Sequence, residues 1–247
     1  MNPLAPVREP GRGFMVSVLG GFHLWWKGSL QAGIPRASQR VLAFLALSSP
    51  VVSRAAVAGT LWPDASEGHA HSNLRAALSR LERNYRNALM TSRLELGLAL
   101  GVTVDIRHSQ ALARRLLNPA VTLPPSDVDA AAIVALSADL LPGWYDDWVL
   151  IEAEDWRQLR LHALEALADR LTAAGRWGEA ADAACTAMRA EPLRESAHVA
   201  LIQVHLAEGN QSEALRAFAR YRALLHTELG LEPTPRIRLL VHGSQSV

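Results

Sequence analysis

The stretch AHSNLRAALSRLERNY, residues 70–85, decides the interpretation of the first half of the chain. Its apolar residues recur at helical spacing, so one face packs inward: Leu74, Ala77, Leu78, Leu81 and Tyr85. The outer and flanking positions are polar and mostly basic: Ser72, Asn73, Arg75, Ser79, Arg80, Arg83 and Arg86. A helix of this kind fits the major groove of B-DNA, where arginine pairs with guanine and serine or asparagine contacts other base edges. A solvated surface helix has the same pattern, so this stretch alone leaves DNA binding open.

Two further features favour DNA binding. A preceding helix is predicted over residues 54–62, with Ser53 as its N-cap and Pro63 at its end, which gives a helix-turn-helix arrangement. Residues 1–105 hold 11 basic and 6 acidic residues, a net charge of +5, whereas residues 106–247 hold 14 and 18, a net charge of −4. This asymmetry suggests that one part faces a polyanion and the other faces proteins.

Short strands are predicted on both sides of these helices. Strands are expected over Met15–Leu19, Phe22–Trp26, Leu94–Leu96 and Val102–Ile106, and a further helix over Ser38–Leu47. The last two strands form either a closing hairpin or separate pairs. Residues 1–13 lack periodicity and are interpreted as a flexible leader. The predicted order is therefore strands, three helices, then strands.

The chain after residue 106 is predicted to be helical. The expected helices span residues 107–117, 128–140, 147–174, 177–190, 194–207, 211–228 and 234–242. The sequence GRWGEA at 175–180 is followed 34 residues later by GNQSEA at 209–214. A period of 34 is typical of tetratricopeptide repeats, in which stacked helical hairpins share a core. The full consensus is not met, because the usual Trp-Leu-Gly-Tyr pattern of the first helix is missing, so helical repeats are predicted without a regular array.

Five motifs in order carry a resemblance to a known family. They are LWPD at 61–64, NLR at 73–75, GVTVD at 101–105, LLPGWYDDW at 140–148 and ELGLEP at 228–233. With them, most of the chain resembles the antibiotic regulatory protein family of bacterial transcriptional activators. The resemblance implies a mainly α fold. An N-terminal winged helix-turn-helix domain (α+β) of response-regulator type is expected over residues 14–106, and an all-α, tetratricopeptide-like bacterial transcriptional activator domain over residues 107–247.

The resemblance also implies a set of DNA-binding residues. They are Arg36, Arg40, Ser72, Asn73, Arg75, Ser79, Arg80, Arg83, Arg86 and Arg93. Helix 70–85 would be the recognition helix, Arg36 and Arg40 would meet phosphates, and Arg93 would enter the neighbouring minor groove. Two departures weaken the match: Glu82 stands where many relatives have a basic residue, and the hairpin around residues 88–96 is short.

The partners that the resemblance implies are double-stranded promoter DNA and RNA polymerase, with its sigma factor as the family expectation. The helical domain would form a homodimer, contact the polymerase, or do both. A second interpretation is a helical-repeat adaptor whose winged helix binds protein instead of DNA. The two differ in salt dependence, because phosphate contacts weaken steeply as salt rises.

Composition and motifs also exclude classes of protein. The only cysteine, Cys185, excludes a disulfide scaffold and a cysteine-rich zinc site, and suggests a reducing cytosol. Apolar runs are too short for a membrane span and the first residues hold no signal sequence, so a cytoplasmic protein is expected. No phosphate-binding loop, nucleophile elbow or dinucleotide motif is found, so neither an enzyme nor a cofactor is predicted. His69 and His71 point to different helix faces, and no metal site is predicted.

Overall fold

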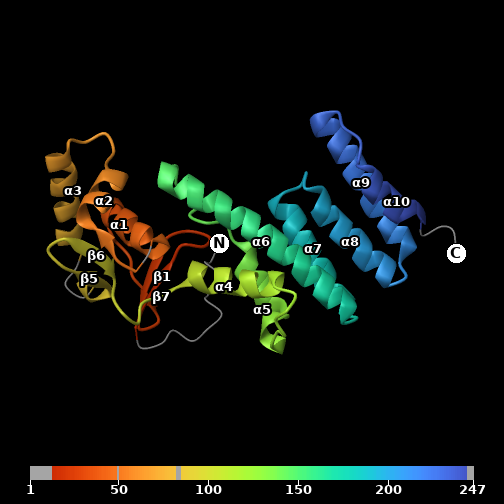
Figure 1. Ribbon diagram of the computed structural model, residues 1–247, viewed down its shortest axis with the longest axis horizontal. Coiled ribbons are helices and arrows are strands. Elements are labelled where there is room, and N and C mark those ends of the chain that lie inside the picture. Colours follow the sequence, from red (N-terminus) through yellow and green to blue (C-terminus); the bar gives the residue numbers. More distant parts are fainter. Residues whose placement is uncertain (1–12, 49, 82–84, 244–247) are drawn as a thin grey trace. The chain divides into compact units, whose positions relative to one another are not determined.

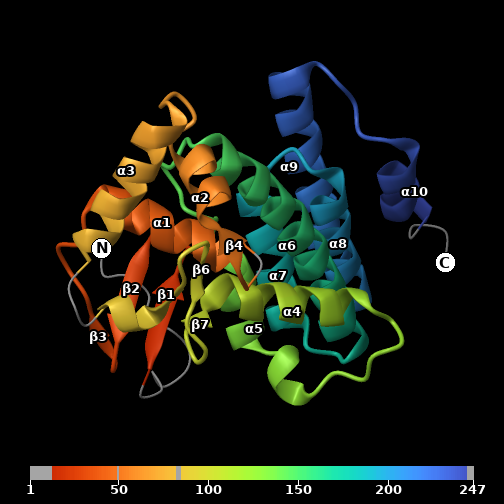
Figure 2. The same cartoon turned by 60° about the vertical axis from the view of Figure 1, so that its left-hand side comes forward.

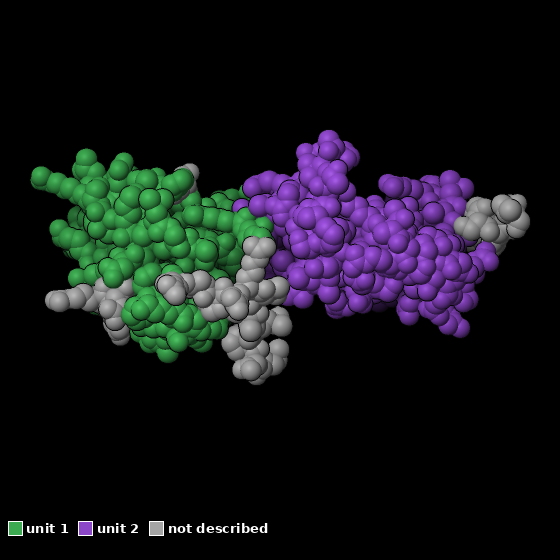
Figure 3. Space-filling model, turned by 90° about the horizontal axis from the view of Figure 1, so that it is seen from below, with its two compact units in different colours: residues 1–108, 139–155 green, residues 109–138, 156–247 purple. Residues whose placement is uncertain are grey.

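The computed structural model describes residues 13–48, 50–81 and 85–243. They form two compact units (Figure 3). The first unit comprises Met1–His108 and Asp139–Asp155, and the second comprises Ser109–Ala138 and Trp156–Val247. The sequence predicts a single boundary after residue 106. The structure instead groups residues 139–155, which hold the motif LLPGWYDDW, with the first unit.

The first unit begins with a small mixed sheet. Its strands are β1 (Phe14–Ser17), β2 (His23–Trp26), β3 (Ser29–Leu30) and β7 (Thr103–Val104), in the order β3-β2-β1-β7. β1 pairs antiparallel with β2, where Val16 lies opposite Leu24, and parallel with β7. Both residues are fully buried, because alternate residues of each strand face the helices. The predicted strands are confirmed here with shifted ends.

Three helices follow: α1 (Arg36–Leu47), α2 (Arg54–Leu61) and α3 (Glu67–Ser79) (Figure 1). α1 contacts β1 and packs against both α2 and α3. Their apolar faces meet in a core that contains Leu42, Leu61 and Leu74, each at most 1% exposed. Ser38 is buried in α1, and its hydroxyl donates to the Ala77 carbonyl of α3 at 2.7 Å. This bond satisfies a polar group that would otherwise cost free energy in the core.

A second sheet follows the helices in the order β4-β6-β5. Its strands are β4 (Val52–Ser53), β5 (Leu89–Thr91) and β6 (Glu95–Leu98), and the 3-10 helix η1 (Tyr85–Ala88) precedes β5. Ser53 belongs to β4 and also caps α2, since its hydroxyl accepts from the Ala56 amide at 3.1 Å. At Gly97 a Cβ atom would lie 2.2 Å from the Pro50 carbonyl oxygen, so the close approach of the chain at Pro50 requires glycine. The β5–β6 hairpin is therefore fixed to the start of α2.

Residues 139–155 join the first unit through backbone pairing and an aromatic cluster. Leu140 forms an antiparallel bridge with Leu19, and the Leu141 amide donates to the Val18 carbonyl at 2.8 Å. The buried Trp144 lies near Phe22, with ring centres 6.1 Å apart. The ring of Trp148 meets Trp144 edge to face at 6.4 Å, and Phe44 of α1 in the same manner at 5.4 Å. These contacts explain why a segment between two helical stretches belongs to the first unit.

Asp105, the last residue of the motif GVTVD, ties β1 to the start of helix α4 (Asp105–Leu117). Its carboxylate accepts from the Ser17 hydroxyl at 2.5 Å and from the amides of Val18, Leu19 and Ile106. Burial raises the pKa of Asp105, and these four donors oppose that rise. The motif thus closes the first unit where β7 ends.

The second unit consists of helices. In chain order they are the 3-10 helix η2 (Pro125–Asp127), α5 (Ala130–Ser137), α6 (Asp147–Ala173), α7 (Trp177–Ala190), α8 (Glu195–Ala207), α9 (Gln211–Leu229) and α10 (Pro235–Gly243), with most of α4 and of α6 in this unit. α7 packs on α8 and α8 packs on α9, in succession along the chain (Figure 2). In the described part of the chain, no helix combines the length and apolar character needed to cross a membrane.

The 34-residue repeat is visible in this stacking. Gly175 and Gly209 both adopt positive φ, 71° and 84°, at the turns before α7 and α9. Ala180 and Ala214, five residues after each glycine, are both fully buried. Equivalent positions thus have equivalent roles, and the predicted helical repeats are confirmed.

Candidate nucleic-acid interface

The predicted recognition helix is shorter than its pattern indicates. The α-helix ends at Ser79 and not at Tyr85, with Arg80 as its C-cap. Leu81 and Tyr85 are nevertheless buried, Tyr85 from the separate helix η1, with its hydroxyl 2.9 Å from the Gln31 side-chain oxygen. The prediction that the helix runs to Tyr85 is therefore wrong. Leu81 and Tyr85 keep helical spacing in the sequence and are buried, although the backbone is no longer α-helical there. Arg83 and Glu82 lie outside the described residues.

The outer face of α3 is polar and exposed. It presents the side chains of Ser72, Asn73, Arg75, Ser79 and Arg80. The contacts of these side chains are local: Arg75 donates to the Ser72 hydroxyl at 3.0 Å, and Ser79 donates to the carbonyl of Ala76. Among the described residues, neither Arg75 nor Arg80 has an ion-pair partner. This face therefore offers two cations and several hydrogen-bonding groups to a ligand.

Arg86 differs from the other predicted DNA contacts because it serves the end of α3. Its guanidinium donates to the Ser79 carbonyl at 2.8 Å and to the Leu81 carbonyl at 3.2 Å. Carbonyls at a helix C-terminus lack partners within the helix, and a cation there also interacts favourably with the helix dipole. Arg86 thus binds the backbone at the end of α3.

Arg93 lies at the tip of the β5–β6 hairpin and is exposed. The turn is held by the Ser92 hydroxyl, which accepts from the amides of Leu94 and Glu95 at 3.2 Å and 2.9 Å. Arg54 of α2 binds the same turn, because its side chain donates to the Ser92 carbonyl at 3.0 Å. The hairpin is short, as its sequence predicts, but it is anchored to the helix-turn-helix.

Arg40, predicted as a phosphate contact, is engaged within the first unit. The same guanidinium nitrogen donates to the Leu61 carbonyl at 2.7 Å and to the Asp146 carboxylate at 2.5 Å. The Arg40 and Asp146 side chains are only 21% and 18% exposed. The prediction that Arg40 meets phosphates is therefore not supported by its contacts, which join α1, the end of α2 and residues 139–155.

Arg36, one helical turn before Arg40, also faces residues 139–155. Its guanidinium carbon lies 3.5 Å from the ring centre of Trp144, a close cation–π contact. Burial lowers the pKa of Arg36, while the nearby Asp146 carboxylate opposes that shift. Local sequence patterns could not reveal these partners, since Arg40 and Asp146 are 106 positions apart.

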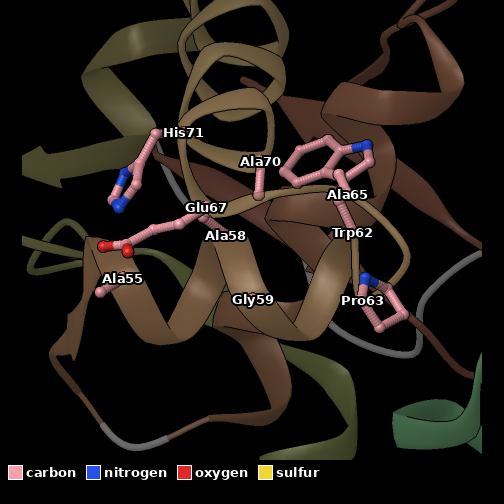
Figure 4. Close-up of a pocket in the computed structure, with 9 residues that line it drawn as sticks. All are labelled: Ala55, Ala58, Gly59, Trp62, Pro63, Ala65, Glu67, Ala70 and His71. Atoms are coloured by element: carbon pink, nitrogen blue, oxygen red, sulfur yellow. The ribbon is translucent and has the colours of Figure 1, made fainter.

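A small hollow of about 230 Å³ lies between α2 and α3 (Figure 4). Its wall is mostly small and apolar, and Figure 4 shows the side chains of Glu67 and His71 extending together toward Ala55. These two are its only titratable lining residues. Across the described residues, no cluster of three or more His, Cys, Asp or Glu side chains is arranged to hold a metal ion.

Comparison with known proteins assigns the helical part of the chain. Residues 127–243 match the bacterial transcriptional activator domain. "Regulatory protein AfsR" of Streptomyces griseus is 28% identical over 240 residues, which cover 90% of this chain and 23% of that protein. The Streptomyces coelicolor protein of the same name is 27% identical over 260 residues, which cover 97% of this chain and 25% of that protein. The chain therefore spans about a quarter of the length of these relatives.

Among solved structures, Mycobacterium tuberculosis EmbR in complex with low affinity phosphopeptide has a similar fold. The TM-score is 0.69 at 21% identity, over 94% of this chain and 65% of that one. The chain shares with this structure a small N-terminal β region with three helices, followed by helical repeats. The helical part of the chain, residues 127–243, thus matches the bacterial transcriptional activator domain.

Proposed function

We propose that the chain is a sequence-specific DNA-binding transcriptional activator that inserts α3 into the major groove of promoter DNA. The observation that carries the proposal is the free outer face of α3. Arg75 and Arg80 have no ion-pair partner among the described residues, whereas the nearby Arg40 is paired with Asp146. A face with unpaired cations and short polar side chains suits base edges and phosphates.

Each residue of the interface has a distinct role in this proposal. Arg75 and Arg80 pair with bases or phosphates, and Ser72, Asn73 and Ser79 complete the contacts along the groove. Arg93 reaches the neighbouring minor groove from the hairpin, whose turn Arg54 holds in place. Arg86 positions the end of α3, and Arg36 and Arg40 position residues 139–155.

The activator domain supplies the protein contacts. We propose that it recruits RNA polymerase, with the sigma factor as the contacted subunit, and that two copies bind direct promoter repeats about one DNA turn apart, near 10 base pairs. The regulated genes would form a biosynthetic or other pathway cluster. The protein would act in the cytoplasm on the bacterial nucleoid.

Footprinting of the bound promoter followed by gel-shift titration tests the DNA-binding step. Arg80→Ala is expected to weaken binding by about 1–3 kcal/mol, a factor of roughly 5–150, if Arg80 pairs with a base. Arg238→Ala is the matched control, because this exposed arginine of α10 also lacks an ion-pair partner among the described residues. It removes the same charge and should leave the affinity unchanged.

Two outcomes would contradict the proposal. Equal losses in Arg80→Ala and Arg238→Ala would mean that only the net charge matters. Absence of any retention on heparin or DNA at low salt would favour the adaptor interpretation, since a phosphate-binding protein must be retained there and be released as salt rises.

A further inference from the structure

The loop of the β5–β6 hairpin carries a large apolar side chain on which the DNA-binding proposal does not draw. Arg93 and Leu94 are the two central residues of the loop, because the Ser92 amide donates to the Glu95 carbonyl at 3.0 Å and closes the loop around them. The Leu94 side chain is exposed, with 74% of the residue accessible to solvent. The leucine therefore lies in water directly beside the arginine that the proposal directs to the minor groove.

The backbone of this loop is held by bonds that do not involve the Leu94 side chain. The Leu94 carbonyl accepts from the Arg54 amide at 2.8 Å, and the Leu94 amide donates to the Ser92 hydroxyl at 3.2 Å. The Arg54 side chain donates to the Ser92 carbonyl at 3.0 Å. The loop is thus tied to the first residue of α2, and it can meet a ligand with little further loss of conformational entropy.

The charge of the loop favours DNA as that ligand. Arg54 and Arg93 contribute two cations, against the single carboxylate of Glu95. Within the described ranges, none of these three side chains has an ion-pair partner. The net positive charge attracts the minor groove, whose negative potential is strong where the groove is narrow.

The chemistry of leucine limits what Leu94 can do in that groove. Its side chain forms no hydrogen bonds, so it gains nothing from the edges of the bases. Proteins that bind the minor groove frequently insert apolar side chains, leucine among them, between two base pairs. The inserted side chain leaves water and covers the faces of bases, and the partly unstacked duplex bends toward the major groove. Pyrimidine–purine steps unstack most easily.

We propose that Leu94 acts as a wedge that enters a base step of the minor groove beside Arg93 and bends the promoter DNA. The inference rests on the proposed function, because α3 and Arg93 bring the hairpin to the groove. It adds that the bound DNA is deformed, at a step where no side chain needs to form a hydrogen bond with a base.

The test measures bending and unstacking, with the full chain bound to the promoter fragment that footprinting locates. Energy transfer between dyes at the two ends of the DNA reports the bend. The fluorescent base 2-aminopurine, placed in turn at each adenine of the site, becomes brighter where a base unstacks. The parent chain is expected to bend the DNA by about 20–90° and to raise the fluorescence at one pyrimidine–purine step.

The decisive variant is Leu94→Ala, which leaves the backbone bonds of the loop in place. It should lose more than about half of the bend and the rise in fluorescence, because alanine is too short to separate base pairs. Leu94→Met keeps a long apolar side chain and should retain both signals. Leu100→Ala is the matched control, since this leucine is fully exposed in the turn after β6, at the opposite end of the hairpin. It should bend DNA as the parent does.

The affinity of Leu94→Ala for DNA should differ from that of the parent by less than about tenfold, because the cost of bending and the contacts that offset it are lost together. Its thermal unfolding should match that of the parent, since the side chain is exposed. An unbent parent complex, or a bend that persists in Leu94→Ala, would overturn the wedge and leave the proposed function intact. Failure of the parent chain to bind DNA at all would overturn the proposed function, and the wedge with it.

Discussion

Helices α1 and α3 both carry arginines that resemble DNA contacts in the sequence, yet their surroundings differ. On α1, Arg40 binds Asp146 and the Leu61 carbonyl, and Arg36 lies on Trp144. On α3, Arg75 reaches only Ser72 of its own helix. The arginines of α1 join this helix to residues 139–155, whereas those of α3 remain available to a ligand.

The difference shows that the residue type of an arginine does not decide its role. A guanidinium with two partners in fixed positions must break those contacts before it can bind a phosphate, which costs free energy. A guanidinium with one exposed partner on its own helix loses little free energy when it leaves that partner to bind DNA. Substitutions on α1 should therefore reduce stability, and substitutions on α3 should reduce affinity.

The largest effect is expected for Arg40→Ala. It removes the Leu61 contact and leaves the Asp146 carboxylate, only 18% exposed, without its partner. We expect a loss of about 2 kcal/mol in the free energy of unfolding, between the values typical of surface and buried pairs. Chemical denaturation measures it, and a double-mutant cycle with Asp146→Ala isolates the pair. Unchanged stability together with a large loss of DNA affinity would reverse the roles assigned to the two helices.

Arg75→Ala should have the opposite profile. The side chain is exposed and touches only Ser72, so the free energy of unfolding should change by less than about 0.5 kcal/mol. DNA affinity should fall by about 1.5 kcal/mol, and if Arg75 meets a phosphate the salt slope should fall by about one. Gel-shift titrations at several salt concentrations measure both quantities. A stability loss similar to that of Arg40→Ala would show that Arg75 has a structural role.

Arg86→Ala should lie between these two extremes. It removes two hydrogen bonds to the carbonyls of Ser79 and Leu81, and we expect about 1 kcal/mol lower stability. Because the end of α3 then loosens, DNA affinity should fall as well, through the changed position of α3. Arg86→Lys keeps the charge but loses the paired contacts. If the lysine variant fully restores affinity, Arg86 acts through its charge and is itself a DNA contact.

The sequence predicts the elements of this fold better than their partners. Helices α6 to α10 lie within one or two residues of their predicted ends, because long amphipathic stretches and glycine turns mark them clearly. The end of α3 is missed because Leu81 and Tyr85 keep helical spacing while the backbone changes to η1. An apolar pattern records which residues are buried, and different backbones can bury the same residues.

For the candidate site, too, the sequence predicts which residues are exposed better than it predicts which residues they contact. The exposed polar face of α3 follows from its periodicity, since the buried Leu74 and Ala77 fix which side faces outward. The roles of Arg36 and Arg40 depend on Trp144 and Asp146, more than 100 positions away, and no local pattern encodes that pairing. The motif LLPGWYDDW contributes to the resemblance, but only the contacts show that it packs on α1.

Among the substitutions that should lower the free energy of unfolding, Arg36→Ala is expected to have the smallest effect, which distinguishes Arg36 from Arg40, the other arginine of α1. Arg36 is exposed and its contact is a single ring, so Arg36→Ala should lower stability by about 0.5–1 kcal/mol. Arg36→Lys keeps a cation near Trp144 but loses the planar stacking, and should recover only part of the loss. Denaturation of both variants and of Trp144→Leu measures the coupling. If Arg36→Ala instead leaves the free energy of unfolding unchanged and weakens DNA binding, Arg36 contacts phosphate as its sequence position suggests. The contrast between the arginines of α1 and those of α3 would then rest on Arg40 alone.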